Sequence, residues 1–180
     1  MMIFIKHRFI QHKINPYTEN LIVGTFNPDT ADNEADFFYG RERNFLWRLL
    51  PTAFGYENLK GKSKNEKLDF IQQYKIDFID LISEVNVDEG QEANYDDRYI
   101  DKKVKEWREV VDELKKLSNL KRVAFTRKTL NDIPRMKIRV EAIQKYCTEK
   151  QISFQFLKTP ARTYSESKQK LWTDFFSNDN

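Results

Sequence analysis

The chain has 180 residues, 39% hydrophobic and 33% charged, a composition that predicts one globular domain over residues 1–180 and excludes a disordered chain. No apolar run approaches the ~20 residues of a membrane-spanning helix, and Lys6 and Arg8 interrupt the N-terminus too early for a signal peptide. We therefore expect a cytoplasmic protein with no membrane partner. The single cysteine, Cys147, excludes an internal disulfide, and with only two histidines besides we expect no metal and no cofactor.

The net charge of +3 is unevenly distributed along the chain. Residues 115–170 hold 15 basic and 4 acidic residues, a balance of +11, whereas residues 1–90 hold 11 basic and 14 acidic residues. Such asymmetry is typical of a side that faces a polyanion. The alternative is that these lysines and arginines only solvate two helices.

The first half of the chain predicts an edge strand, a buried strand and two helices. In chain order these are residues 1–9, 20–26, 44–54 and 64–74. The buried strand closes with the turn formers Asn27 to Asp29, and Pro51 limits the first helix. An acidic loop leads to the aromatic cluster Phe37-Phe38-Tyr39 between the strand and that helix.

The second half alternates strands and helices. The predicted elements are a strand at 76–82, a polar loop at 88–97, a helix at 98–117, a strand at 122–126, a helix at 135–150, a strand at 152–157 and a helix at 165–176. The long helix at 98–117 is predicted because Val104, Trp107 and Leu117 belong to an apolar series at helical spacing. Asp96 and Asp97 are expected to cap it, and Asp80, inside an apolar strand, needs a buried partner.

This alternation predicts an α/β fold, a three-layer α/β/α sandwich with a central, mostly parallel sheet of four to five strands. Ligands of such sheets bind beyond the carboxyl ends of the strands. The segments expected to hold the site are residues 25–29, 83–86, 126–129 and 159–163.

Five sequence blocks resemble, in order, motifs of the uracil-DNA glycosylase superfamily. They are Gly24-Thr25-Phe26-Asn27-Pro28, the stretch 38–47, the segments 79–82 and 94–100, the apolar strand 123–126, and Leu157-Lys158-Thr159-Pro160-Ala161-Arg162. The first is similar to the family's strand followed by Asn-Pro. The second resembles the aromatic, Asn and Trp block of the mismatch-specific and hypoxanthine-glycosylase branches. The last resembles the Ser-Pro-Ser-Pro-Ala-Asn loop that enters the DNA minor groove.

The resemblance implies a DNA glycosylase that hydrolyses the N-glycosidic bond of a deaminated or mismatched base, uracil or hypoxanthine, in base-excision repair. Its partner would be DNA carrying that base, and we expect a monomer. The catalytic residues would be Asn27 or Asp29, orienting the attacking water, and Asn44, as base reader or water holder. The base-binding residues would be Thr25, Phe26, Phe38, Tyr39 and Asp80, with Phe38 or Tyr39 as the stacking face. The DNA-binding residues would be Arg43, Lys158, Thr159, Pro160 and Arg162.

The sequence departs from the family pattern at several places. Asp29 replaces a glycine, Arg41-Glu42 replaces His-Pro, and Arg162 stands where asparagine is usual. These departures leave open a catalytically inactive nucleobase or nucleic-acid binding module on the same fold.

Several candidate residues also have a purely structural interpretation. The aromatic cluster at 37–39 would pin the acidic loop to the core, and Asn44 would cap the helix that follows it. His7 and His12 read as incidental surface residues.

Overall fold

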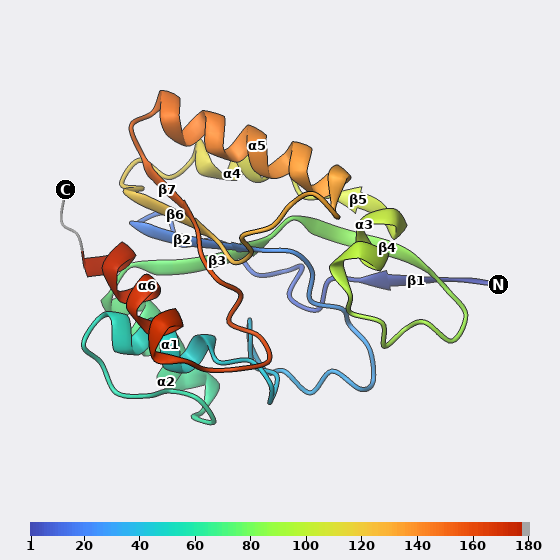
Figure 1. Ribbon diagram of the computed structural model, residues 1–180, viewed down its shortest axis with the longest axis horizontal. Helices are drawn as coiled ribbons and strands as arrows, with labels where there is room; N and C mark the ends of the chain where they lie inside the picture. The colour runs from blue at the N-terminus through green and yellow to red at the C-terminus, as the bar shows by residue number, and fades with distance from the viewer. Residues whose placement is uncertain (178–180) are drawn as a thin grey trace.

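The computed structural model describes residues 1–177, and its centre is a four-stranded parallel sheet. The strands are β2 (Asn20–Gly24), β3 (Ile76–Asp80), β6 (Arg122–Phe125) and β7 (Ser153–Phe156), in the order β3-β2-β6-β7. All three neighbouring pairs are parallel. Helices cover both faces, as Figure 1 shows, so the predicted three-layer α/β/α arrangement is confirmed.

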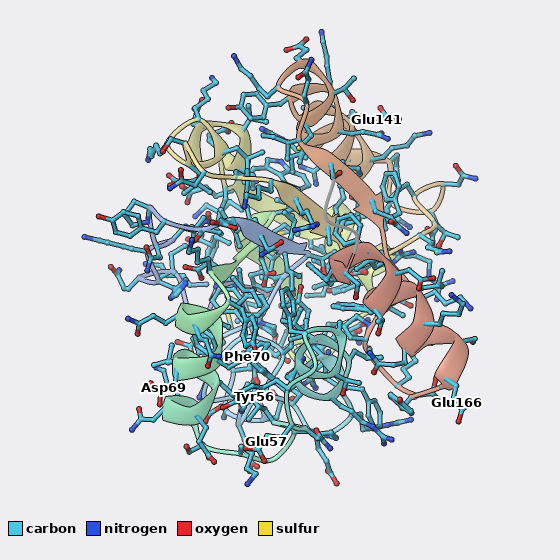
Figure 2. The ribbon with its side chains drawn as sticks, turned by 90° about the vertical axis from the view of Figure 1, so that its left-hand side faces the viewer. Tyr56, Glu57, Asp69, Phe70, Glu141 and Glu166 are labelled. Atoms are coloured by element: carbon cyan, nitrogen blue, oxygen red, sulfur yellow. The ribbon has the colours of Figure 1, made fainter. Side chains whose placement is uncertain are left out.

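The two outer layers enclose separate apolar cores. On one face lie α1 (Leu46–Ala53), α2 (Lys64–Gln73) and α6 (Glu166–Ser177), and on the other α4 (Val110–Leu114) and α5 (Pro134–Glu149). Successive residues of a strand point to opposite faces, so Ile22 packs under α1 and Val23 under α5. Within the first core Tyr56 packs on Phe70 of α2, with ring centroids 5.2 Å apart (Figure 2). Within residues 1–177, no helix is long and apolar enough to cross a membrane.

A second, antiparallel sheet adjoins the first. It contains β1 (Met2–Lys6), β4 (Ile82–Asp88) and β5 (Val104–Trp107), in the order β1-β4-β5. Only Leu81 separates β3 from β4, so the chain passes directly from one sheet into the other. The predicted strand at 1–9 is therefore an edge strand, but of this second sheet.

The structure corrects three predicted segments. The strand expected at 76–82 ends at Asp80, and residues 83–86 lie inside β4 instead of forming a site loop. The helix expected at 98–117 is divided into α3 (Asp97–Lys103), β5 and α4. Val104 leaves the helical region at φ −61°, ψ 124° and pairs with Val85. The apolar spacing of this segment suits a helix, but antiparallel pairing with β4 holds residues 104–107 as a strand.

Asp101 of α3 caps α5 from a distant part of the chain. The buried carboxylate accepts hydrogen bonds from the backbone N–H groups of Arg135 at 3.2 Å and Met136 at 2.6 Å. The α5 N-cap residue itself, Ile133, makes no side-chain cap. The orphan donors of this helix end are therefore satisfied by a tertiary contact.

We predict that Asp101→Ala lowers the free energy of unfolding by about 2–3 kcal/mol, because two N–H groups at a buried helix end would have no acceptor. Chemical denaturation followed by circular dichroism measures the change. As a control, Glu141→Ala, on the outer side of α5 (Figure 2), should leave the denaturation midpoint unchanged. A midpoint for Asp101→Ala equal to that of the control would contradict the capping role.

Candidate functional site

The candidate site lies at the carboxyl edge of the parallel sheet, where four strand ends meet. Gly24 and Asp80 end β2 and β3 and stand opposite each other in the strand register. Thr126 follows β6, and its backbone N–H donates to the Val23 carbonyl at 3.1 Å. Parallel pairing places all strand exits on one edge, so groups more than a hundred residues apart become neighbours.

Gly24 sits against two polar side chains. A Cβ added to it would lie 2.3 Å from Asp80 Oδ1 and 2.5 Å from Tyr39 Oη. The Thr126 hydroxyl donates to the Val23 carbonyl at 3.4 Å, so its oxygen accepts from the Tyr39 hydroxyl at 3.3 Å. Burial, and next the charge of Asp80, raise the pKa of Tyr39 well above its usual value. Tyr39 therefore stays a neutral phenol.

His7 is a buried member of the site, which corrects its expected place on the surface. Its side chain is fully covered, and Nε2 lies 2.7 Å from Asp80 Oδ2. The Phe9 backbone N–H donates to Nδ1 at 3.0 Å, so the ring proton is on Nε2 and is donated to Asp80. Asp80 thereby gains the partner that its strand position demanded.

His12, also expected on the surface, is half-buried and forms a similar pair with Asp77 at 2.6 Å. Asp77 lies three residues before Asp80 in β3 and has both oxygens occupied. Its Oδ1 accepts from His12 and from the Phe78 N–H, and its Oδ2 accepts from the Asn15 N–H. This second pair is a closed structural contact.

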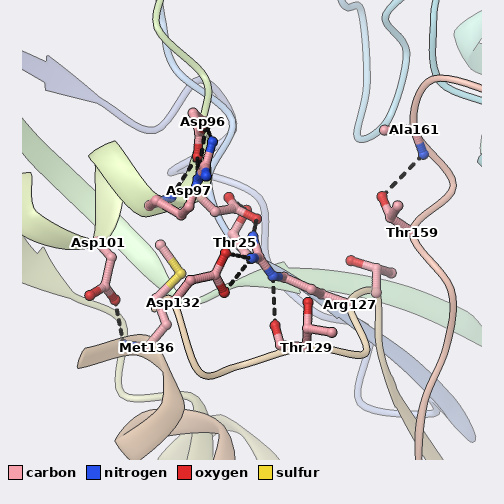
Figure 3. A network of polar contacts seen from close by, with 12 residues as sticks. Thr25, Asp96, Asp97, Asp101, Arg127, Thr129, Asp132, Met136, Thr159 and Ala161 are labelled. Carbon is pink, nitrogen blue, oxygen red and sulfur yellow. Dashed lines mark hydrogen bonds and ion pairs between the residues drawn. The ribbon is translucent and has the colours of Figure 1, made fainter. Parts of the chain in front are cut away.

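A third polar network joins β2, β6 and α3 (Figure 3). Asp97 accepts from the Thr25 hydroxyl at 2.8 Å and from Arg127 Nη1 at 2.7 Å. Arg127 also binds both oxygens of Asp132 at 2.7 Å. Burial raises the pKa of Asp97 even though Arg127 opposes the shift. Arg127 lies in the segment 126–129 that is expected to hold the site, although it is not among the named candidates, and Asp97 is expected only as a helix cap.

Asn27 is held in one orientation by Asn33. The Ala35 N–H donates to Asn33 Oδ1 at 3.2 Å, so Asn33 Nδ2 must face the Pro28 carbonyl and Asn27 Oδ1, at 2.7 and 2.6 Å. The oxygen of Asn27 is thus engaged, and its Nδ2 is left as a donor. Asp29 lies apart from this contact, because its exposed carboxylate pairs with Arg8 at 3.1 Å.

The two aromatic stacking candidates differ in exposure. Phe38 is 2% exposed and stacks on Phe78 with ring centroids 5.6 Å apart, while Phe9 lies 5.1 Å away. Phe38 therefore presents no free face and pins the loop to the core. Tyr39 and Phe26 are half-buried, and Tyr39 adopts a positive φ of 56°.

The stretch 38–47, called the Arg-Asn block after Arg43 and Asn44, lies beside the final loop at residues 157–162. Asn44 and Ala161 form an antiparallel bridge, the Phe45 N–H donates to the Pro160 carbonyl at 2.8 Å, and the Arg162 N–H donates to the Arg43 carbonyl at 2.7 Å. Asn44 Oδ1 also accepts from the Leu46 N–H at 3.0 Å, at the start of α1. In the loop itself Thr159 Oγ1 accepts from the Ala161 N–H at 3.2 Å (Figure 3).

A buried lysine, not among the predicted residues, supports this loop. Lys168 Nζ donates to the Thr163 carbonyl at 2.6 Å and lies 3.5 Å from the Ala161 carbonyl. Burial, and next the charge of Lys158, lower its pKa. The first turn of α6 thus fixes the loop that α6 follows.

Most of the basic stretch 115–170 is paired with carboxylates. The paired cations include Lys115, Lys116, Lys121, Arg127, Lys137, Arg139 and Lys145. Within residues 1–177, Arg43, Lys158 and Arg162 are exposed and form no ion pair. Positive charge without a partner is therefore present along the Arg-Asn block and the final loop.

Other potential sites are distant from these groups or absent. A hollow of about 590 Å³ opens at the amino-terminal edge of the sheet, lined by residues such as Glu19, Phe54 and Lys121. In the described part of the chain, no three His, Cys, Asp or Glu side chains are grouped to hold a metal ion.

No family model and no curated protein sequence matches the chain. Among solved structures, the fold is similar to the solution NMR structure of a protein from Methanosarcina acetivorans described as a "putative Uracil DNA glycosylase". The two sequences are 18% identical, the match covers 91% of each chain, and the TM-score is 0.63. The likeness shows a common fold over nearly the whole chain.

We predict that Gly24→Ala lowers the free energy of unfolding by about 1–3 kcal/mol, because the added methyl group overlaps Asp80 Oδ1 and Tyr39 Oη. A double-mutant cycle with Tyr39→Phe locates the clash. Without the hydroxyl, the same substitution should cost measurably less in thermal or urea unfolding. An equal cost in both backgrounds would assign the strain to the contact with Asp80 Oδ1 and not to Tyr39.

Proposed function

We propose that this chain is a DNA glycosylase that removes a deaminated or mismatched base, uracil or hypoxanthine, by hydrolysing its N-glycosidic bond. The observation that carries the proposal is the direct pairing of Asn44 with Ala161. The resemblance matches the blocks around these residues to different family motifs more than a hundred residues apart. Their contact at the carboxyl edge of the sheet is the arrangement that one DNA-binding site requires.

The surrounding groups support distinct roles in binding. The unpaired cations Arg43, Lys158 and Arg162 suit contacts to phosphates. The base would be turned out of the duplex into the site, where Tyr39 offers a ring and the Asn27 amide a hydrogen-bond donor. Such a donor would hold a carbonyl oxygen of the departing base as negative charge develops on it.

The alternative is a nucleic-acid binding module without the chemistry. It is favoured by the engagement of the two residues expected to orient water, Asn27 with Asn33 and Asp29 with Arg8. Such a module would bind DNA in a salt-sensitive manner and yield no abasic product.

An excision assay separates these functions. Purified protein is incubated with labelled oligonucleotides carrying one uracil or one hypoxanthine, single-stranded or mispaired, and alkali then cleaves abasic sites. The proposal expects strand breaks at the modified position that disappear in Asn27→Ala. DNA bound at low salt with no break on any substrate would support the binding module.

We predict that the double variant Arg43→Ala/Arg162→Ala weakens DNA binding by at least about tenfold at low salt, because two cations that neutralise phosphates are removed. A plot of the logarithm of the DNA association constant against the logarithm of the salt concentration has a negative slope. Its magnitude should decrease by about 0.9 for each phosphate that is no longer neutralised. Fluorescence anisotropy with one oligonucleotide measures both quantities.

The matched control is Lys137→Ala/Lys145→Ala. It also removes two positive charges, but both lysines lie on α5 and pair with glutamates of their own helix. It should leave both affinity and slope nearly unchanged. Equal reductions in the two double variants would mean that binding follows net charge alone.

A further inference from the structure

Hydrolysis at the proposed site needs an acceptor for the proton of the attacking water. Asn27 Oδ1 already accepts from Asn33, and the Asp29 carboxylate is exposed and paired with Arg8. Asp80 differs from both. It is a carboxylate only 5% exposed, at the end of the strand next to Gly24, and His7 occupies one of its two oxygens.

The second oxygen of Asp80 remains available. Oδ1 accepts no hydrogen bond from any residue within 1–177, yet it keeps contact with solvent. Within the same residues, the side-chain atoms that are both sealed and unpartnered are Asn86 Oδ1 and Gln169 Oε1. Asp80 therefore presents one free, water-accessible oxygen from an otherwise buried carboxylate.

Tyr39 and Gly24 define where this oxygen points. Asp80 Oδ1 and Tyr39 Oη flank the same point beside Gly24. Because the Tyr39 hydroxyl donates to Thr126, its oxygen faces this point as an acceptor. A water that donates to both oxygens from their outer side would have its lone pairs directed away from them. Glycine at position 24 is needed because the two oxygens occupy the space that a β-carbon would fill, so such a water would lie beyond the oxygens and not at Gly24 itself.

We propose, on the premise of the glycosylase function above, that Asp80 is the catalytic carboxylate that deprotonates the attacking water and that His7 is its positioning residue. The water oxygen bonds to C1′ of the deoxyribose as the bond from C1′ to the base nitrogen breaks. The electron pair of that bond leaves with the base. The water proton passes to Asp80 Oδ1 and is then released to the departing base or to solvent.

His7 acts through Asp80. Its tautomer is fixed by the Phe9 N–H, so Nε2–H points at Oδ2 and holds the carboxylate with Oδ1 toward the site. The Asp77–His12 pair on the same strand shows the contrast. Both oxygens of Asp77 accept hydrogen bonds from protein donors, so this carboxylate has no free oxygen for a water.

The test measures the single-turnover excision rate and the DNA dissociation constant separately. Asp80→Asn removes the base at almost constant shape, so the rate should fall by about 10²–10⁴, with the dissociation constant and melting temperature nearly unchanged. His7→Leu should lower the rate by about tenfold or more, because a loosened base is misplaced. His7→Gln retains a donor near the Nε2 position and should restore most of the rate.

Asp77→Asn is the matched control. Both Asp77 oxygens accept hydrogen bonds, so an amide nitrogen in place of one of them leaves a protein donor without an acceptor. The variant should therefore have a lower melting temperature, while folded protein keeps the wild-type rate. If the Asp80→Asn variant does not fold, the excision rate of the Asp80→Glu variant tests the role of Asp80 instead. It keeps the charge but displaces the oxygens, and should lower the rate by at least about tenfold at unchanged DNA affinity.

Three outcomes would contradict the inference or part of it, and they differ in whether the proposed glycosylase function is also contradicted. Wild-type rates in folded Asp80 variants, with an active wild-type protein, overturn the role of Asp80 and leave the proposed function intact. A rate for His7→Gln as low as that for His7→Leu removes the positioning role. A wild-type protein that releases no base from any substrate overturns both the inference and the proposed function.

Discussion

The hydrogen bond between His7 and Asp80 joins the two sheets at the point where the site is built. Asp80 ends β3, Leu81 follows, and β4 begins at Ile82, so the parallel and antiparallel sheets share one continuous chain. His7, just after β1, reaches across this junction to the carboxylate. The bond satisfies two buried polar side chains at once, and a buried carboxylate without a partner would be costly. The geometry around Gly24 and Tyr39 depends on it.

Charge at the carboxyl edge falls into two kinds. Buried and half-buried charges are compensated inside the fold: Asp97 is paired with Arg127, and Lys168 donates to loop carbonyls. Arg43, Lys158 and Arg162 are exposed and form no ion pair with any residue within 1–177. The basic stretch 115–170 is therefore a mixture. Many of its lysines and arginines form ion pairs worth little individually, whereas Lys158 and Arg162 form no ion pair within residues 1–177 and can attract a polyanion.

The helix predicted over 98–117 shows why local patterns fail at particular places. Val104 and Trp107 are spaced for one helix face, but they also suit a strand, and pairing with Val85 and Ile82 decides between the two. The burial of His7 is not predicted by the sequence for a related reason. A lone histidine in a polar N-terminal segment carries no sign of burial, and its partner is 73 residues away. Phe38 shows the converse: its aromatic character is clear from the sequence, but only its packing against Phe78 and Phe9, at 2% exposure, shows that the ring has no free face.

The sequence by itself determined the alternation of strands and helices, the α/β/α layers, and the edge of the sheet where the candidate groups gather, because these follow from periodicity and from the handedness of parallel crossovers. It also indicated that Asp80 needs a partner. The tertiary structure alone decided which groups are engaged and which are free: Asn27 with Asn33, Asp29 with Arg8, Asp80 with one open oxygen. Side-chain hydrogen bonds between distant segments depend on distances of a few tenths of an ångström, and no local pattern in the chain encodes them.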